Sequence, residues 1–76
     1  MGPERRSDDV IQRDILQSFT RRDDLDARDI EIAVEQGEVT LGGTVESRDE
    51  RWLAEDLVEL VAGVSLVHNQ LRIARP

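Results

Sequence analysis

The chain has 76 residues, of which 38% are hydrophobic and 36% charged, so it has room for one domain with a modest core and little room for a large catalytic cleft. Its net charge of −7, from 17 acidic and 10 basic residues, repels nucleic acid and anionic surfaces on average, so any anion binding must be local. The absence of cysteine excludes disulfides, thiol redox chemistry and sulfur-ligated metal sites, and no apolar run approaches membrane-spanning length.

The first predicted element is a helix that follows a short N-terminal tail. Residues 1–6 are expected to form a flexible tail. Ser7, followed by Asp8 and Asp9, is typical of a helix start, because the hydroxyl caps free amides and the carboxylates favour the positive end of the helix dipole. An apolar stripe at helical spacing then predicts a face packed into the core, formed by Ile11, Ile15, Leu16 and Phe19.

Two strands are predicted next, joined as an antiparallel hairpin. Apolar and polar residues alternate over residues 30–34 and again over residues 39–45, which is the period of a strand buried on one face. Gly37 lies in the short connection between them, where a turn is needed. Gly42 and Gly43 lie inside the second strand, and no lysine or serine follows as a phosphate-binding loop requires. This pair therefore predicts a bulge, or the close approach of a helix over the sheet.

A second helix and a third strand complete the domain. Ser47 and Glu50 have the spacing of a capping box, so a helix should begin here, and Gly63 should end it. A strand is then expected over about residues 64–73, with Asn69 on the inward face as a structural amide whose hydrogen bonds are satisfied. The apolar face of the helix is predicted to contain Leu53, Ala54, Leu57, Leu60 and Val61, and that of the strand Val67, Asn69, Leu71 and Ile73.

The predicted order is helix, strand, strand, helix, strand. It indicates an α+β fold, a two-layer αββαβ sandwich in which two helices pack on one face of a three-stranded mixed sheet. The strand order stays open, because the connection through a helix permits either a parallel pairing of the second and third strands or a sheet with the first strand between them.

The glycines, apolar positions and polar residues of these elements resemble the BON domain, the bacterial osmotically inducible and nodulation domain. The resemblance covers nearly the whole chain, with residues 7–74 as a single BON-like domain. It rests on Leu25-Asp26 and Asp29-Ile30, Gly37-x-Val39-x-Leu41-x-Gly43-x-Val45, Arg51 and Ala54, and Gly63-Val64-x-x-Val67-x-Asn69-x-Leu71. Within this pattern Gly37, Gly43, Gly63 and Asn69 are the expected structural motif residues.

The resemblance implies an αββαβ fold and a non-enzymatic module that binds phospholipid or other envelope components, as in osmotic-stress and outer-membrane proteins. Family members are frequently exported and often carry two such modules, whereas this chain shows one copy. Because the chain has no signal peptide, we expect either a cytoplasmic protein or an excised module of an envelope protein. No catalytic residue, cofactor, metal site or nucleic-acid partner is expected, and the isolated domain should be a monomer.

Trp52, Arg48 and Arg51 are the candidate lipid-binding residues. Helical spacing places Trp52 on the polar side of the second helix, where its ring could anchor at a lipid headgroup region with the two arginines bound to phosphates. The alternative is local packing, in which the Arg48 guanidinium stacks on the indole. Nearby carboxylates predict weak, salt-sensitive binding.

Other polar residues are expected to have no catalytic or metal-binding role. His68 is predicted to face solvent on the third strand, without a nucleophile or orienting group. The aspartates between residues 23 and 29 lack the glycine and closing glutamate of a calcium loop, although Asp26 or Asp29 could cap nearby amides.

A second function class is a protein–protein or intramolecular adaptor. Lipid binding predicts one exposed patch of Trp52 and arginines, whereas an adaptor predicts an apolar or unpaired sheet edge. RNA binding is disfavoured by the charge and by the lack of a GxxG loop.

Overall fold

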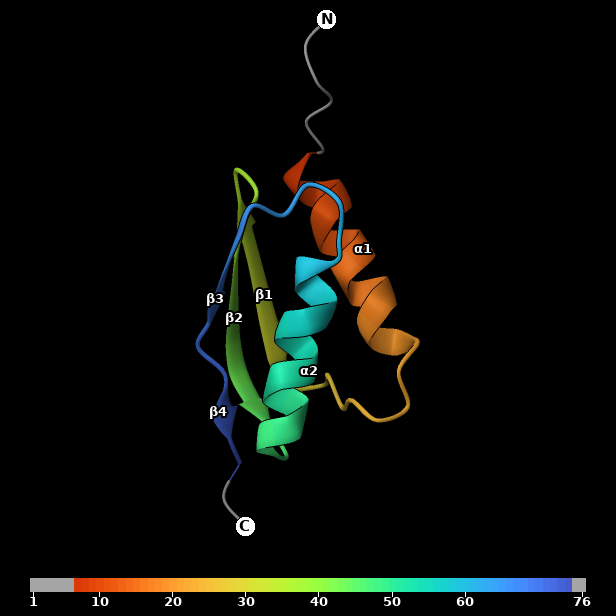
Figure 1. Cartoon of the computed structure of the whole chain (residues 1–76), viewed down its shortest axis with the longest axis vertical. Coiled ribbons are helices and arrows are strands. Elements are labelled where there is room, and N and C mark those ends of the chain that lie inside the picture. The colour runs from red at the N-terminus through yellow and green to blue at the C-terminus, as the bar shows by residue number, and fades with distance from the viewer. Residues whose placement is uncertain (1–6, 75–76) are drawn as a thin grey trace, which may run out of the picture.

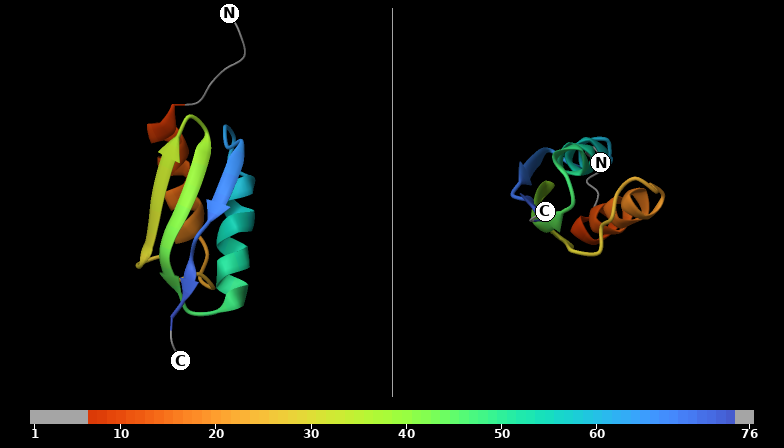
Figure 2. Two further views of the ribbon diagram at one scale, coloured as in Figure 1. Left: turned by 90° about the vertical axis from the view of Figure 1, so that its left-hand side faces the viewer. Right: turned by 90° about the horizontal axis from the view of Figure 1, so that it is seen from below.

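The computed structural model describes residues 7–74 and has the predicted two-layer architecture (Figure 1). The elements are α1 (Asp8–Thr20), β1 (Ile30–Glu35), β2 (Glu38–Val45), α2 (Arg48–Glu59), β3 (Leu66–Asn69) and β4 (Arg72–Ile73). Both helices lie on one face of the sheet and leave the other face uncovered (Figure 2). The α+β fold class is therefore confirmed, and the predicted N-terminal tail, residues 1–6, lies outside the described residues.

The sheet is mixed, and β2 is its central strand. β1 pairs with β2 antiparallel, and Ile30 lies opposite Gly43. β3 and β4 both pair with β2 in parallel on its other side, with Val39 opposite Val67 and Thr44 opposite Arg72. Of the two strand orders left open by the sequence, the structure has the one in which the second and third predicted strands are neighbours.

The single third strand predicted over residues 64–73 is wrong, because the structure divides it into β3 and β4. The break falls at Gln70 and Leu71. The Asn69 side chain accepts a hydrogen bond from the Leu71 amide at 3.1 Å, which holds the chain in a local turn between the two strands. Beyond the break, Ile73 is 42% exposed instead of sharing the buried face with Leu71.

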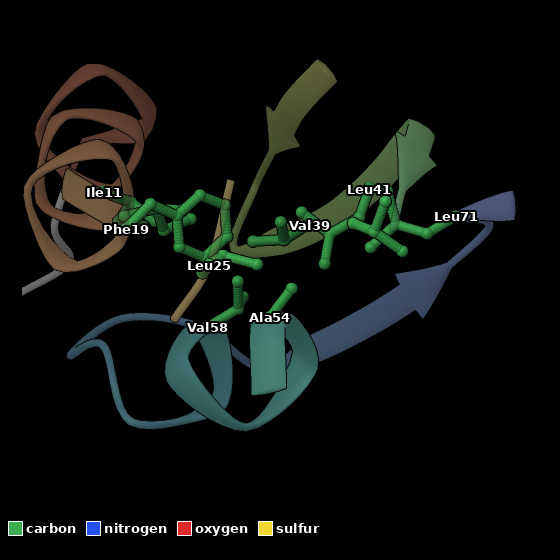
Figure 3. Packing of buried hydrophobic residues seen from close by; sticks show 10 residues of the cluster. Ile11, Phe19, Leu25, Val39, Leu41, Ala54, Val58 and Leu71 are labelled. Carbon is green, nitrogen blue, oxygen red and sulfur yellow. The ribbon is translucent and has the colours of Figure 1, made fainter. Parts of the chain in front are cut away.

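The core lies between the sheet and the two helices, and its buried side chains come from α1, β2, α2 and the two connecting segments that contain Leu25 and Leu71 (Figure 3). The predicted α1 stripe is correct except for Leu16, which is 47% exposed because it lies about 100° around the helix from Ile15. On α2, Val58 is fully buried although it was not predicted in the apolar face, and Leu60 is 83% exposed because it lies past the helix end. The buried residues are Ile11, Ile15, Phe19, Leu25, Val39, Leu41, Val45, Ala54, Val58 and Leu71.

Both helix starts are confirmed. The Ser7 hydroxyl accepts a hydrogen bond from the Val10 amide, and the Ser47 hydroxyl accepts one from the Glu50 amide. The Glu50 carboxylate reaches back to the amide of Glu46 at 2.9 Å, so the capping interaction is reciprocal but shifted by one residue. α2 ends at Glu59 and not directly before Gly63, because the chain tightens into consecutive turns after the helix.

Candidate functional site

The outward face of α2 carries Trp52 and Arg48. Ala54 and Val58 define the buried side of this helix, and the helical period places Trp52 nearly opposite them. Trp52 is 58% exposed, and Arg48, one turn before it, is also exposed. We call these two residues the α2 outer surface.

Arg51 does not join the α2 outer surface as predicted. It lies on the flank of α2 that faces β3, where its backbone carbonyl accepts a hydrogen bond from the Asn69 side chain at 3.1 Å. Its side chain is partly buried, and its Nε atom is buried without a hydrogen-bond partner among the described residues. Trp52 and Arg48 are therefore both exposed, one turn apart on α2, whereas Arg51 is partly buried on the adjacent flank of the helix.

Carboxylates surround the α2 outer surface. Asp49, Asp56 and Glu59 are exposed and lie on the same outward half of the helix. Within residues 7–74, no ion pair connects Arg48 to a carboxylate. The local field is therefore mixed in sign, with one free guanidinium beside the indole and several acids within two turns.

Hydrogen bonds from the Asn69 side chain connect the end of β3 to α2. Its Nδ2 donates to the Arg51 carbonyl at 3.1 Å and to Glu55 Oε1 at 3.0 Å, while its Oδ1 accepts from the Leu71 amide. Both amide hydrogens and the carbonyl oxygen thus have partners, which fits the structural role expected of this side chain.

Gly37 joins the β1–β2 hairpin to the loop before β3. Gln36 and Gly37 both have positive φ, 52° and 84°, as the two central residues of a type I′ turn require. A Cβ on Gly37 would lie only 2.9 Å from the carbonyl oxygen of Gly63, which itself has φ 98°. The Ser65 amide donates to the Gly37 carbonyl at 2.8 Å, so the hairpin tip and this loop are directly bonded.

Glycine is required at position 43 because another backbone segment passes close to it. This segment is the chain just before β1, and not a helix as the sequence suggested. Gly43 has φ 92°, and a Cβ at this position would overlap the carbonyl oxygen of Asp29. The same carbonyl accepts a hydrogen bond from the Thr44 amide at 3.1 Å. Gly43 therefore allows the start of β1 to pair closely with the end of β2.

The acidic loop before β1 is organised by neighbouring arginines. Asp26 accepts three side-chain hydrogen bonds from Arg28 and one from its backbone amide, and these bonds lower the pKa of Asp26 to about 2. Asp24 pairs with Arg22 at 2.8 Å, and this pairing lowers the Asp24 pKa. Among residues 7–74, no three acidic or histidine side chains gather in a way that could hold a metal ion.

His68 lies exposed on β3, as expected. Its Nε2 is 3.4 Å from Glu38 Oε1 on the neighbouring strand β2. Both residues are exposed and alternate along their strands with the more buried Val67, Asn69 and Val39, so the pair lies on the sheet face away from the helices.

The free edge of β1 is a feature that the sequence did not predict. β1 has β2 on one side, and in the described part of the chain no strand lies on its other side. Gln12 of α1 reaches this edge, where its Nε2 donates to the Ile32 carbonyl at 3.5 Å. Periodicity alone cannot identify an edge strand, because it gives the face of each residue but not the neighbours of the strand.

Comparison with protein families matches the chain to the BON domain over residues 7–75. Since the match covers nearly the whole chain, the protein belongs to the BON domain family. No curated protein matches the chain in sequence. Neither helix within residues 7–74 has the length and hydrophobicity needed to cross a membrane.

Proposed function

We propose that this domain is a non-catalytic binding module that interacts weakly with membrane phospholipid through the α2 outer surface. Membership of the BON family supports this function class. The observation that carries the proposal is the exposure of Trp52, at 58%, on the outward face of a helix with the exposed Arg48 one turn away.

The two side chains supply complementary interactions with a bilayer surface. An indole is favourable at the headgroup region, because its ring is apolar and its N–H can donate a hydrogen bond. A guanidinium binds phosphate oxygens with parallel hydrogen bonds. Asp49, Asp56 and Glu59 lie close by and oppose an anionic surface, so the affinity should be low and should fall as salt is added.

The test is a titration of the domain with vesicles of anionic phosphatidylglycerol and of zwitterionic phosphatidylcholine, at low and at physiological salt. Binding is followed by co-sedimentation and by the fluorescence of Trp52, which is the only tryptophan in the chain. We expect salt-sensitive binding to the anionic vesicles, with a blue shift of the emission as the indole leaves water.

Two substitutions test the surface, and a third is the matched control. Arg48→Glu should weaken binding to anionic vesicles about tenfold or more, because each charge near the surface contributes about 1 kcal/mol. Trp52→Ala should also reduce co-sedimentation. Arg13→Glu makes the same change in net charge at an exposed position of α1 and should have a much smaller effect. Equal losses for Arg48→Glu and Arg13→Glu, or no sedimentation at any lipid concentration, would contradict the proposal.

A second candidate function is the adaptor, in which the domain binds another protein segment. The specific observation in its favour is the free edge of β1, because an edge strand presents backbone N–H and C=O groups that an added strand can pair with. This edge belongs to the strand farthest from β3, whereas the α2 outer surface points away from the sheet. The two candidate surfaces are therefore distinct.

A further inference from the structure

We propose that the free edge of β1 binds an extended segment of a partner protein in which apolar and basic residues alternate. This inference rests on the adaptor function and specifies the partner. It is carried by the free backbone groups of β1, by a largely apolar groove at the loop that leads into this strand and by the carboxylates on the outer face of the strand.

The hydrogen-bond pattern identifies the free groups. The Thr44 amide donates to the Asp29 carbonyl, and in an antiparallel pair the residues that bond to the partner strand alternate with those that do not. Ile30, Ile32 and Val34 therefore direct their backbone groups away from β2. Consistent with this phase, the Ile30 amide donates instead to the carbonyl of Ala27 at 3.1 Å.

The free edge is only lightly protected. Of the outward groups, the Ile32 carbonyl has the Gln12 side chain as its partner, at the long distance of 3.5 Å. The Ile32 amide and both backbone groups of Val34 have no partner among residues 7–74. A strand that displaced Gln12 would lose one weak bond and gain several ladder bonds.

A largely apolar groove lies on the helix side of the sheet, at the loop that leads into β1. Gln12 places one flank of α1 against β1, and Leu16, one turn further along, is 47% exposed on that flank. The groove has a volume of about 410 Å³ and lies between α1 and the loop before β1. Alternate side chains of an added strand point towards this layer, so apolar residues fit there. The apolar residues of the groove are Leu16, Phe19, Leu25 and Ala27, and its polar lining is Thr20, Asp26 and two arginines, Arg22 and Arg28, each paired with an aspartate.

The other face of β1 is acidic. Glu31 and Glu35 are exposed there, and Glu38 follows on β2 opposite Glu35. An added strand would place its remaining side chains beside these carboxylates, where opposite charges stabilise the pairing and like charges destabilise it. A second copy of the chain is a poor occupant, because its β1 would bring the same glutamates alongside and each copy has a net charge of −7.

The test uses a hexapeptide of alternating valine and arginine, which matches the six residues of β1. Binding to the full chain is followed by the backbone amide signals in NMR and by hydrogen exchange. We expect shifts centred on Ile32 and Val34, slower exchange of these two amides, and little change at Trp52. The double substitution Glu31→Lys with Glu35→Lys should weaken binding about three- to tenfold. Gln12→Ala should strengthen it, because the Ile32 carbonyl is then free.

Two control peptides separate the possible explanations. A peptide of the same sequence with N-methyl groups on alternate backbone nitrogens keeps the charges but cannot complete a strand ladder, so it should not bind. Equal binding of this peptide, or shifts at α2 instead of β1, would overturn the proposal. A peptide of alternating valine and glutamate should bind less well. If it binds the β1 edge equally, the adaptor function stands but the basic partner is wrong.

If no peptide shifts the β1 amides, the edge does not dock an extended segment, and the adaptor function at this edge fails with it. Vesicle binding through Trp52 is measured separately and is unaffected by that result. Sedimentation velocity of the free chain provides the last check, since a dimer that Glu35→Lys alters would identify a second copy as the occupant.

Discussion

Gly42 and Gly43 are neighbours in β2 but have different structural requirements. Gly43 has φ 92°, and the Asp29 carbonyl occupies the space that a side chain would need, whereas a Cβ on Gly42 would meet only Glu31 Oε1, at 3.8 Å. We expect Gly43→Ala to lower the free energy of unfolding by about 3 kcal/mol, because it combines an unfavourable backbone conformation with a steric overlap. Gly42→Ala is the matched control and should change it by less than about 1 kcal/mol. Urea denaturation of the two variants measures the difference, and equal stability would contradict this explanation.

Asp26 should make the stability of the domain depend on pH, and only under acidic conditions. Its pKa is lowered to about 2 from 3.8 by the hydrogen bonds from Arg28, so the folded state favours the ionised carboxylate. The resulting stabilisation is present above about pH 4 and is lost as the pH falls towards 2. Unfolding curves across this range should show a small loss of stability that is reduced in Asp26→Asn. Asp23→Asn, at an exposed position without an ion-pair partner among the described residues, is the control and should behave like the wild type.

Among the secondary-structure elements, β3 is held in position by the side chain of Asn69, its own last residue. Asn69 joins β3 to α2 and to the turn before β4 through three hydrogen bonds of 3.0–3.1 Å. Asn69→Ala should lower the free energy of unfolding by about 2 kcal/mol or more, because it leaves partly buried backbone groups without partners. Glu55→Ala removes only one of these bonds, so it should lower the free energy of unfolding by less than Asn69→Ala does. Thermal unfolding of both variants provides the measurement, and a larger effect from Glu55→Ala would show that the backbone bonds of Asn69 are not the important ones.

The elements themselves were largely predictable from the sequence, because local signals determine them. Ser7 and Ser47 mark the helix starts through hydrogen bonds to residues three positions away. The division of the last strand into β3 and β4 was not predictable from periodicity, since Asn69 interrupts the strand through a side-chain bond to the Leu71 amide. The exposed position of Leu60 was missed for a similar reason: the helix ends at Glu59, and the apolar pattern continues beyond it.

At the scale of the whole molecule, the sequence pattern predicts which faces of the elements are buried, but it does not predict which strands are neighbours. The exposure of Trp52 follows from helical spacing alone, and the structure agrees with it. The partial burial of Arg51 depends on how α2 is rotated over β3, which is a tertiary property. The free edge of β1 likewise follows from the strand order, because only the position of β2 at the centre leaves β1 with one open side.

The central position of β2 also has a consequence for the synthesis of the chain. A ribosome releases the residues in order, so the β1–β2 hairpin, with its two-residue turn, can form as soon as it emerges. The other edge of β2 can form its hydrogen bonds only after residues 66–74 have been synthesised, since Leu66 pairs with Glu38 and the Ala74 amide donates to the Val45 carbonyl. Until then the nascent chain exposes two open edges instead of one. The domain therefore completes its fold only when its last strand has left the ribosome, which makes this the period in which an unwanted partner can most easily pair with β2.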